Sequence, residues 1–413
     1  MAKTYLIIGS GPAGITAAES IRNMDNDAEI TVISEERVPM FYRPRIPEYS
    51  VGKISIEGIM VKKKDFYVQK RINLHLGIKA TKLDKENRII ETSEGNKYGY
   101  DKLLIATGIT PLEPKFPGSR IEGVFTMHDL VQAERMKGFV KDAKQVVVVG
   151  GGLLGMDMAE EFKAIGLNVT FIVRRDILGD PFFDEYGCKL IHDEFKTMGV
   201  EVITNTEVYA FEDMNNRLTT VYTKDGKRFD SDVCFIAIGA THAVDWLKGS
   251  SLKIENGVLV DKYLRSHDDD IFSAGNAAQI MDTVFKKYIT QTNWINAIAQ
   301  GNIAGNNMAG RELMKYETTS TYFKRIGTLF FNLLGTGNLQ VEGGKRDYFK
   351  GGNPKEYIMI TMKEGRIIGA VVCGRNKITS KLKEAIEKQR EISVPDKLIT
   401  QEEKSVDDLS KIF

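Results

Sequence analysis

The sequence predicts an α/β fold built around two units of the same kind, each a strand, a glycine-rich turn and a helix. The first unit has a β-branched and apolar strand at residues 4–8, then Gly9-Ser-Gly11-Pro-Ala-Gly14 and a segment of helical composition. The second unit repeats this order at residues 145–155, again with a Gly-x-Gly-x-x-Gly turn. Such turns between a strand and a helix are typical of Rossmann-like, dinucleotide-binding domains, so we expect two nucleotide sites.

The glycines of each turn have separate tasks. The first allows the tight turn, the second lets the backbone approach a pyrophosphate, and the third lets helix and strand pack closely. The N-terminus of the helix adds amide donors and a partial positive charge. The expected nucleotide contacts are Gly9, Gly11, Pro12, Ala13 and Gly14 in the first turn, and Gly150, Gly152, Leu153, Leu154 and Gly155 in the second.

The two units differ where their second strand ends. In the first unit Glu35 follows Gly14 by 21 positions, close to the ~20 expected for a carboxylate that accepts both ribose hydroxyls. In the second unit the strand ends at Val173, and Arg174 and Arg175 follow. Guanidinium groups favour a 2′-phosphate that a carboxylate would repel. We therefore expect NADPH, in preference to NADH, at the second site; the alternative is that both arginines are merely solvated.

Length, charge and cysteine content indicate the broad class. The chain has 413 residues, 42% hydrophobic and 27% charged, which is typical of a globular protein of several domains. A net charge of +1 gives no reason to expect a nucleic-acid or anionic-membrane partner. Cys188, Cys234 and Cys373 lack disulfide, zinc or iron–sulfur spacing, so no metal is expected. The absence of a signal peptide pattern and of a membrane-length apolar run favours a cytoplasmic protein.

Five motifs in a fixed order resemble a known family. They are IIGSGPAG at 7–14, YDKLLIATGITP at 100–111, VVVVGGGLLG at 146–155, DVCFIAIGA at 232–240 and DDDIFSAGNAA at 268–278. Together they resemble the FAD-dependent pyridine nucleotide-disulfide oxidoreductases, which include glutathione reductase, the ferredoxin and rubredoxin reductases, and the N-terminal part of assimilatory nitrite reductase. The resemblance extends from the first residue to about residue 375.

The resemblance implies an FAD domain that is split by an inserted NAD(P)H domain, followed by a small α+β domain. The FAD domain would be 1–111 and 242–313, the NAD(P)H domain 112–241, the C-terminal domain 314–393 and the tail 394–413. The tail lies beyond the family core and is either a partner-binding helix or a mobile end. Further cofactor contacts implied by the resemblance are Arg43, Ala80, Ala106, Thr107, Gly108, Gly275, Asn276, Trp294 and Gly239.

The chain departs from the family in the loop at 40–53, where the disulfide and peroxide branches carry cysteine. This loop has none and resembles that of NADH:rubredoxin reductase, so the flavin itself would pass electrons onward. Asn276 stands where the family has aspartate, which keeps an acceptor but removes a charge. FAD should still bind.

Glu48 and Asp157 stand where the ferredoxin-reductase branch has a lysine and a glutamate beside the flavin. Two carboxylates in one pocket would raise one pKa unless Arg43 or Arg45 neutralises them. We therefore regard Glu48 and Asp157 as candidate catalytic residues that hold or relay a proton. The alternative is that they lie apart and contact only water.

These expectations imply an FAD-dependent NAD(P)H oxidoreductase that passes electrons, in either direction, between nicotinamide and a small iron–sulfur carrier, rubredoxin or ferredoxin-like. One alternative is an NAD(P)H oxidase or peroxidase, and another is a flavoprotein subunit or redox sensor of a larger complex. A basic surface for docking an acidic carrier is a further hypothesis. Its residues would be Arg43, Arg45, Lys62, Lys63, Lys64, Lys324, Arg325, Lys345 and Arg346.

Overall fold

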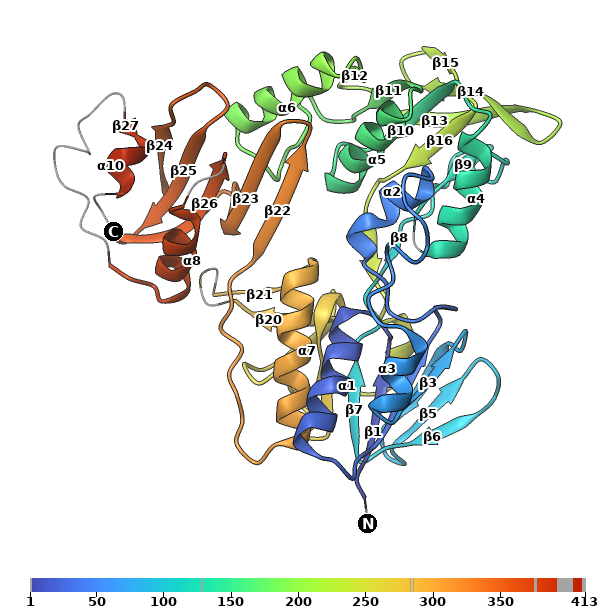
Figure 1. Cartoon of the computed structure of the whole chain (residues 1–413), viewed down its shortest axis with the longest axis vertical. Coiled ribbons are helices and arrows are strands. Elements are labelled where there is room, and N and C mark those ends of the chain that lie inside the picture. Colours follow the sequence, from blue (N-terminus) through green and yellow to red (C-terminus); the bar gives the residue numbers. More distant parts are fainter. Residues whose placement is uncertain are drawn as a thin grey trace. The chain divides into compact units, whose positions relative to one another are not determined.

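The computed structural model of the chain forms two compact units (Figure 1). The structure describes residues 2–127, 129–282, 284, 286–374, 377–391 and 404–410. Unit 1 comprises Met1–Arg45, Ser55–Thr110 and Ala240–Thr318, and unit 2 comprises Ile46–Ile54, Pro111–Gly239 and Thr319–Phe413.

Unit 1 is built on a five-stranded parallel sheet in the order β19-β7-β1-β2-β3. Its strands are β1 (Thr4–Ile8), β2 (Glu29–Ser34), β3 (Ile72–Leu76), β7 (Lys102–Ile105) and β19 (Ile271–Ser273). The smaller strands are β4 (Ala80–Asp84), β5 (Ile89–Thr92), β6 (Lys97–Gly99), β8 (Ile109–Pro111), β17 (Ala240–His242), β18 (Val258–Val260), β20 (Ala278–Met281) and β21 (Tyr288–Ile289). The central strands read as continuous apolar runs because parallel sheets are buried on both faces.

Helices α1 (Pro12–Met24) and α7 (Trp294–Ala309) lie side by side in unit 1 (Figure 1), and the short α3 (Lys64–Gln69) lies near β3. Two glycines of α7 allow the close approach. A Cβ at Gly301 would lie 2.2 Å from the carbonyl oxygen of Ala13, and one at Gly305 would lie 2.5 Å from that of Ala17. The backbones of α1 and α7 are therefore in direct contact.

Unit 2 contains a second five-stranded parallel sheet, in the order β12-β11-β10-β16-β9. Its strands are β9 (Val124–Phe125), β10 (Gln145–Val149), β11 (Asn168–Ile172), β12 (Glu201–Ile203) and β16 (Val233–Ile236), with helices α4 (Leu130–Val140), α5 (Leu153–Ala164) and α6 (Glu185–Thr197). An antiparallel sheet of β13 (Val208–Met214), β14 (Arg217–Thr223) and β15 (Arg228–Asp230) adjoins it. The α/β class with two Rossmann-like parallel sheets is confirmed.

The C-terminal part of unit 2 is a six-stranded sheet in the order β22-β23-β26-β25-β24-β27. Its elements are β22 (Thr321–Ile326), β23 (Leu329–Gly335), β24 (Lys345–Lys350), β25 (Tyr357–Lys363), β26 (Arg366–Cys373), α8 (Thr379–Glu387), β27 (Lys404–Ser405) and α10 (Val406–Ser410). In the described part of the predicted tail, β27 pairs with β24 as an edge strand of this sheet. The short helix α10 follows it, and its residue Leu409 is buried. The rest of the predicted tail, 394–403 and 411–413, lies outside the described residues.

The segment 46–54, which the sequence division assigned to the first domain, lies with unit 2. It contains α2 (Ile46–Ser50), which packs against α4 and α5. Ile46 and Tyr49 are buried, Tyr49 hydrogen-bonds Glu134 on α4, and Lys53 forms a 2.8 Å ion pair with Glu161 on α5. Both buried side chains and polar contacts therefore join this segment to α4 and α5. The division into three domains remains a proposal.

Candidate active site

The first glycine turn has the geometry that a pyrophosphate requires. Gly9 has a φ of +112°, and a Cβ there would lie 2.2 Å from the carbonyl oxygen of Ala106. A Cβ at Gly14 would lie 1.9 Å from the carbonyl oxygen of Gly9. A Cβ at Gly11 would meet nothing within 4 Å. Gly9 and Gly14 therefore permit close packing of the backbone. Gly11 faces open space at the N-terminus of α1, where phosphate oxygens could accept hydrogen bonds from amide groups.

The second glycine turn repeats this geometry in unit 2. Gly150 has a φ of +110°, and its Cβ would lie 2.2 Å from the carbonyl oxygen of Ala237. A Cβ at Gly155 would lie 2.0 Å from the carbonyl oxygen of Gly150. At Gly152 the nearest atom to a Cβ would be a ring carbon of Phe182, at 4.0 Å. The residues present thus fit a dinucleotide at both turns.

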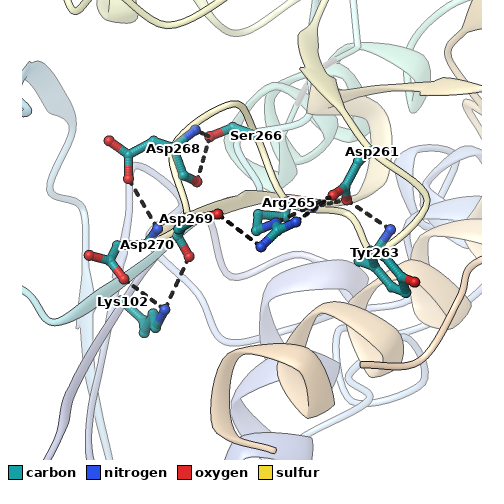
Figure 2. Close-up of polar contacts among 8 residues, drawn as sticks. All are labelled: Lys102, Asp261, Tyr263, Arg265, Ser266, Asp268, Asp269 and Asp270. Atoms are coloured by element: carbon teal, nitrogen blue, oxygen red, sulfur yellow. Dashed lines mark hydrogen bonds and ion pairs between the residues drawn. The ribbon is translucent and has the colours of Figure 1, made fainter. Parts of the chain in front are cut away.

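The acidic segment before Gly275 fixes the edge of the first sheet. Figure 2 shows that Lys102 on β7 reaches Asp270, at 2.7 Å, and the carbonyl oxygen of Asp269, at 3.0 Å. Arg265 forms ion pairs with Asp261, at 3.2 Å, and with Asp269, at 2.8 Å. These contacts hold β19 beside β7, so the turn that follows β19 has a defined place.

A buried network of neutral side chains supports this turn. The amide nitrogen of Gly275 donates to Gln300 Oε1 at 2.7 Å, and Gln300 Nε2 donates to Gln291 Oε1 at 3.2 Å. The Tyr316 hydroxyl donates to the same Gln291 oxygen at 2.6 Å and accepts from Asn296 Nδ2 at 2.8 Å. Gln291, Asn296 and Gln300 are fully buried. Sequence reasoning missed this network, although two amides four residues apart on one helix were a usable signal.

Helix α7 presents its N-terminus beside the predicted aromatic contact. The Asn293 side chain caps the helix by accepting from the amide nitrogen of Asn296 at 2.8 Å. The Trp294 ring meets Tyr42 edge-on, with the ring centroids 4.9 Å apart. Nδ1 of His242 donates to the carbonyl oxygen of Asn276 at 2.5 Å, which fixes the backbone of that residue. The partial positive charge at the start of α7 is suited to an anionic group.

The predicted ribose contact and the predicted arginine contact both lie in unit 1. Glu35 follows β2 directly, is exposed and pairs with Lys79 at 3.1 Å. Arg43 lies 2.5 Å from Glu36, the next carboxylate along the chain. Of the other predicted contacts, Ala80 and Ala106 are buried, Thr107 donates to the carbonyl oxygen of Ala243 at 2.7 Å, and Gly108 and Gly239 have positive φ.

The two arginines after β11 are exposed. Val173, directly before them, is buried. Arg175 forms an ion pair with Asp180. An ion pair with Lys224 holds the pKa of Glu207 below its usual value, and the charge of Arg174 contributes to the shift. Arg174 and Arg175 thus both lie at the end of β11. On binding a 2′-phosphate, Arg175 would exchange its ion pair with Asp180 for one with the phosphate.

Glu48 and Asp157, the candidate catalytic residues, both lie in unit 2, and the charge of Glu48 affects the pKa of Asp157. Burial raises the pKa of Asp157 on α5, the Lys324 ammonium opposes this shift, and the negative charge of Glu48 on α2 adds to it. Lys324 Nζ contacts Asp157 and donates to the carbonyl oxygen of Leu153 at 2.9 Å. Lys324, which the sequence analysis did not connect with this site, is thus a cation that pairs with Asp157.

Lys324 also corrects the docking hypothesis. Its side chain is only 6% exposed, so it cannot belong to a basic docking surface. The alternation of β22 turns Lys324 inward, while its neighbour Arg325 is exposed.

The cysteines do not resemble redox groups. Burial raises the pKa of Cys188 and of Cys373 to about 12, and it also raises the pKa of Cys234. A thiol must ionise to attack, so these side chains are inert at neutral pH. Among the described residues no His, Cys, Asp and Glu group could hold a metal ion, and no described helix is long and apolar enough to span a membrane.

Comparison with protein families matches residues 3–301 to the model described as pyridine nucleotide-disulphide oxidoreductase. The chain belongs to this family. Membership supports FAD and a pyridine nucleotide as cofactors. As a member of the pyridine nucleotide-disulphide oxidoreductases, the chain is an oxidoreductase and a flavoprotein.

The sequences of two relatives match nearly the whole chain. NADH-rubredoxin oxidoreductase of Clostridium acetobutylicum is 26% identical over 93% of this chain and 94% of its own length. NADH oxidase of Methanocaldococcus jannaschii is 27% identical over 91% of this chain and 89% of its own. A chain of the covalent putidaredoxin reductase–putidaredoxin complex has the same fold, with a TM-score of 0.89, 19% identity and 97% coverage of both chains.

Proposed function

We propose that this protein is an FAD-dependent NAD(P)H oxidoreductase that passes electrons between nicotinamide and a small iron–sulfur carrier, rubredoxin or ferredoxin-like. The observation that carries the proposal is the pair of glycine turns with matching geometry, one in each unit. Two dinucleotide sites in one chain suit a reaction in which one nucleotide reduces the other. A relative named for rubredoxin supports the choice of carrier.

The residues of this chain favour direct electron transfer without a thiol relay. All three cysteines are buried, and residues 40–53 contain none. Bound FAD would supply the two-electron chemistry with nicotinamide and the one-electron chemistry with the carrier. The start of α7 would place positive potential near the flavin, and Glu48 and Asp157 would hold the proton that accompanies reduction.

We further propose NADPH as the preferred nucleotide. Arg174 and Arg175 directly follow β11, the strand that pairs with β10 before the second glycine turn. Their charge favours a 2′-phosphate. The names of both relatives specify NADH, so this chain would differ from them at the strand end.

An anaerobic titration tests the reductase proposal. The FAD-loaded protein is titrated with NADPH and, separately, NADH, while the oxidised-flavin absorbance is followed. The reduced protein is then mixed with oxidised rubredoxin, with oxidised ferredoxin or with air. We expect loss of absorbance with NADPH and faster reoxidation by a carrier than by oxygen. No reduction by either nucleotide would contradict the proposal.

An NAD(P)H oxidase is the second candidate, because a relative of nearly full length bears the name NADH oxidase. The same mixing experiment separates the two functions. Reoxidation by air that is as fast as reoxidation by either carrier would favour the oxidase.

A further inference from the structure

Helix α5, which follows the second glycine turn, meets strand β22 of the C-terminal sheet through a group of charges. Asp157 on α5 pairs with Lys324 on β22. One turn further along α5, Glu160 accepts from the amide nitrogen of Gly327 at 3.3 Å and pairs with Arg325 at 3.4 Å. Two carboxylates on one helix face thus meet cations and an amide from the β22–β23 connection.

Lys324 is buried, whereas Arg325, the other cation of this group, is exposed. The Lys324 side chain is 6% exposed, whereas that of Arg325 is 55% exposed. A buried ammonium is costly unless it is paired and hydrogen-bonded. Lys324 meets both conditions, since it contacts Asp157 and donates to the carbonyl oxygen of Leu153.

The contacts of Lys324 lie in the first two turns of α5. Leu153 is the first residue of the helix and Asp157 lies four residues later. Gly152 of the second glycine turn is the N-cap of this helix and directly precedes Leu153. Lys324 therefore fixes the start of the nucleotide-binding helix.

The strand that carries Lys324 is held firmly. β22 pairs with β23 in continuous antiparallel register, with Lys324 opposite Phe331. The same sheet is joined to α6 by Tyr357, which hydrogen-bonds Asp184, and by Lys355, which pairs with Glu194 at 2.7 Å. The position of the Lys324 side chain is thus set by the C-terminal sheet.

We propose that Lys324 is a positioning residue of the active site, which orients the Asp157 carboxylate and sets how tightly the Glu48–Asp157 pair holds a proton. The C-terminal sheet would then contribute a charge to the reaction, in addition to any part in carrier binding. This inference rests on the proposed function.

The charged groups that act on Asp157 come from two other elements, β22 and α2. Lys324 and Arg325 on β22 favour its charged form, and Glu48 on α2 disfavours it. Asp157 in turn acts on Glu160 of the same helix. Removal of the Lys324 charge would take away the buried cation that contacts Asp157, so this carboxylate would hold its proton to higher pH.

The test measures the rate of flavin reduction by the pyridine nucleotide as a function of pH, by anaerobic rapid mixing. For Lys324→Met we expect the pH at which the rate changes to rise by roughly 1–3 units, the range for loss of a close opposite charge. Lys324→Arg should restore the profile, and Arg325→Met, which removes the exposed neighbour, should shift it less. An unchanged profile in Lys324→Met, with normal reduction of the wild type, would overturn the inference.

If Lys324→Met folds too poorly for kinetic measurements, a stability measurement still tests the contact between Lys324 and Asp157. The unfolding free energies of Lys324→Met, Asp157→Asn and the double variant form a cycle that uses no nucleotide. We expect the double variant to be less destabilised than the sum of the single variants. Additive effects would overturn the proposed contact, whereas failure of the wild-type flavin to be reduced by either nucleotide would overturn the proposed function itself.

Discussion

At the residue scale, the side chains that follow the second strand differ in charge between the two glycine-turn units. Glu35 follows β2 and pairs with Lys79, whereas Arg174 and Arg175 follow β11. A carboxylate accepts ribose hydroxyls and a guanidinium binds phosphate. Under the proposed function, the same fold would acquire two nucleotide preferences through a few surface residues.

Substitution of both arginines should therefore change the nucleotide preference. For Arg174→Ala/Arg175→Ala we expect NADPH affinity to fall by at least tenfold, because charge-assisted hydrogen bonds contribute about 1.5–3 kcal/mol each. NADH affinity should change little. Dissociation constants from anaerobic titrations measure this, with the exposed Arg228→Ala on β15 as the control. Equal losses for both nucleotides would refute the 2′-phosphate assignment.

At the element scale, the neutral network beneath Gly275 connects α7 to the turn after β19. Gln300 is its central member, since it accepts from Gly275 and donates to Gln291. Its replacement by an apolar side chain would leave buried polar atoms without partners, which costs about 1–3 kcal/mol. The turn and the helix start would no longer be held together.

For Gln300→Leu we expect weaker FAD binding together with a lower unfolding temperature. Fluorescence of released FAD on dilution and thermal unfolding measure the two effects. Met24→Ala, an exposed residue at the C-terminal end of α1, is the control and should leave FAD binding unchanged. Full retention of FAD by Gln300→Leu would show that the network is structural only.

The seam between α6 and the C-terminal sheet should make stability depend on pH. Asp184 is buried beside Tyr357, and burial raises the pKa of its carboxyl group above the usual value of 3.8. A raised folded-state pKa contributes stability that is present below the unfolded pKa and is lost as pH rises through the folded pKa. Ionisation of Asp184 therefore opposes folding above pH ~4.

Asp184→Asn should remove this pH dependence. The amide is nearly isosteric and can still hydrogen-bond Tyr357, so the loss of unfolding temperature as pH rises from acid values should be smaller than in the wild type. Glu185→Gln, at the adjacent position of α6, serves as the control. Identical pH profiles for the wild type and Asp184→Asn would contradict the assignment.

At the scale of the whole molecule, the sequence predicted features that depend on neighbouring residues better than contacts between residues far apart in the chain. The glycine turns and the ends of the strands that flank them depend on neighbouring residues, and the sequence predicted both. The pairing of Lys324 with Asp157 joins residues 167 positions apart, and no local pattern encodes it. The position of 46–54 in unit 2 likewise depends on packing against α4 and α5, which a linear division into domains does not consider.

The two glycine turns allow the nucleotide sites to be tested separately in the intact protein. Gly11 and Gly152 have φ values of −73° and −82°, which any residue adopts, and an added Cβ would meet nothing within 4 Å at Gly11 and one ring carbon at 4.0 Å at Gly152. Alanine at either position should therefore leave the fold intact and obstruct only a close pyrophosphate.

We expect opposite defects from the two substitutions. Gly11→Ala should fold but purify with much less FAD, because the added methyl group occupies the approach of the FAD pyrophosphate. Gly152→Ala should retain FAD, and its flavin should require at least tenfold more NADPH for the same rate of reduction. Flavin content, circular dichroism and the anaerobic titration give the three readouts. Loss of FAD from Gly152→Ala, or full flavin content in Gly11→Ala, would contradict the assignment of FAD to the first turn and the pyridine nucleotide to the second.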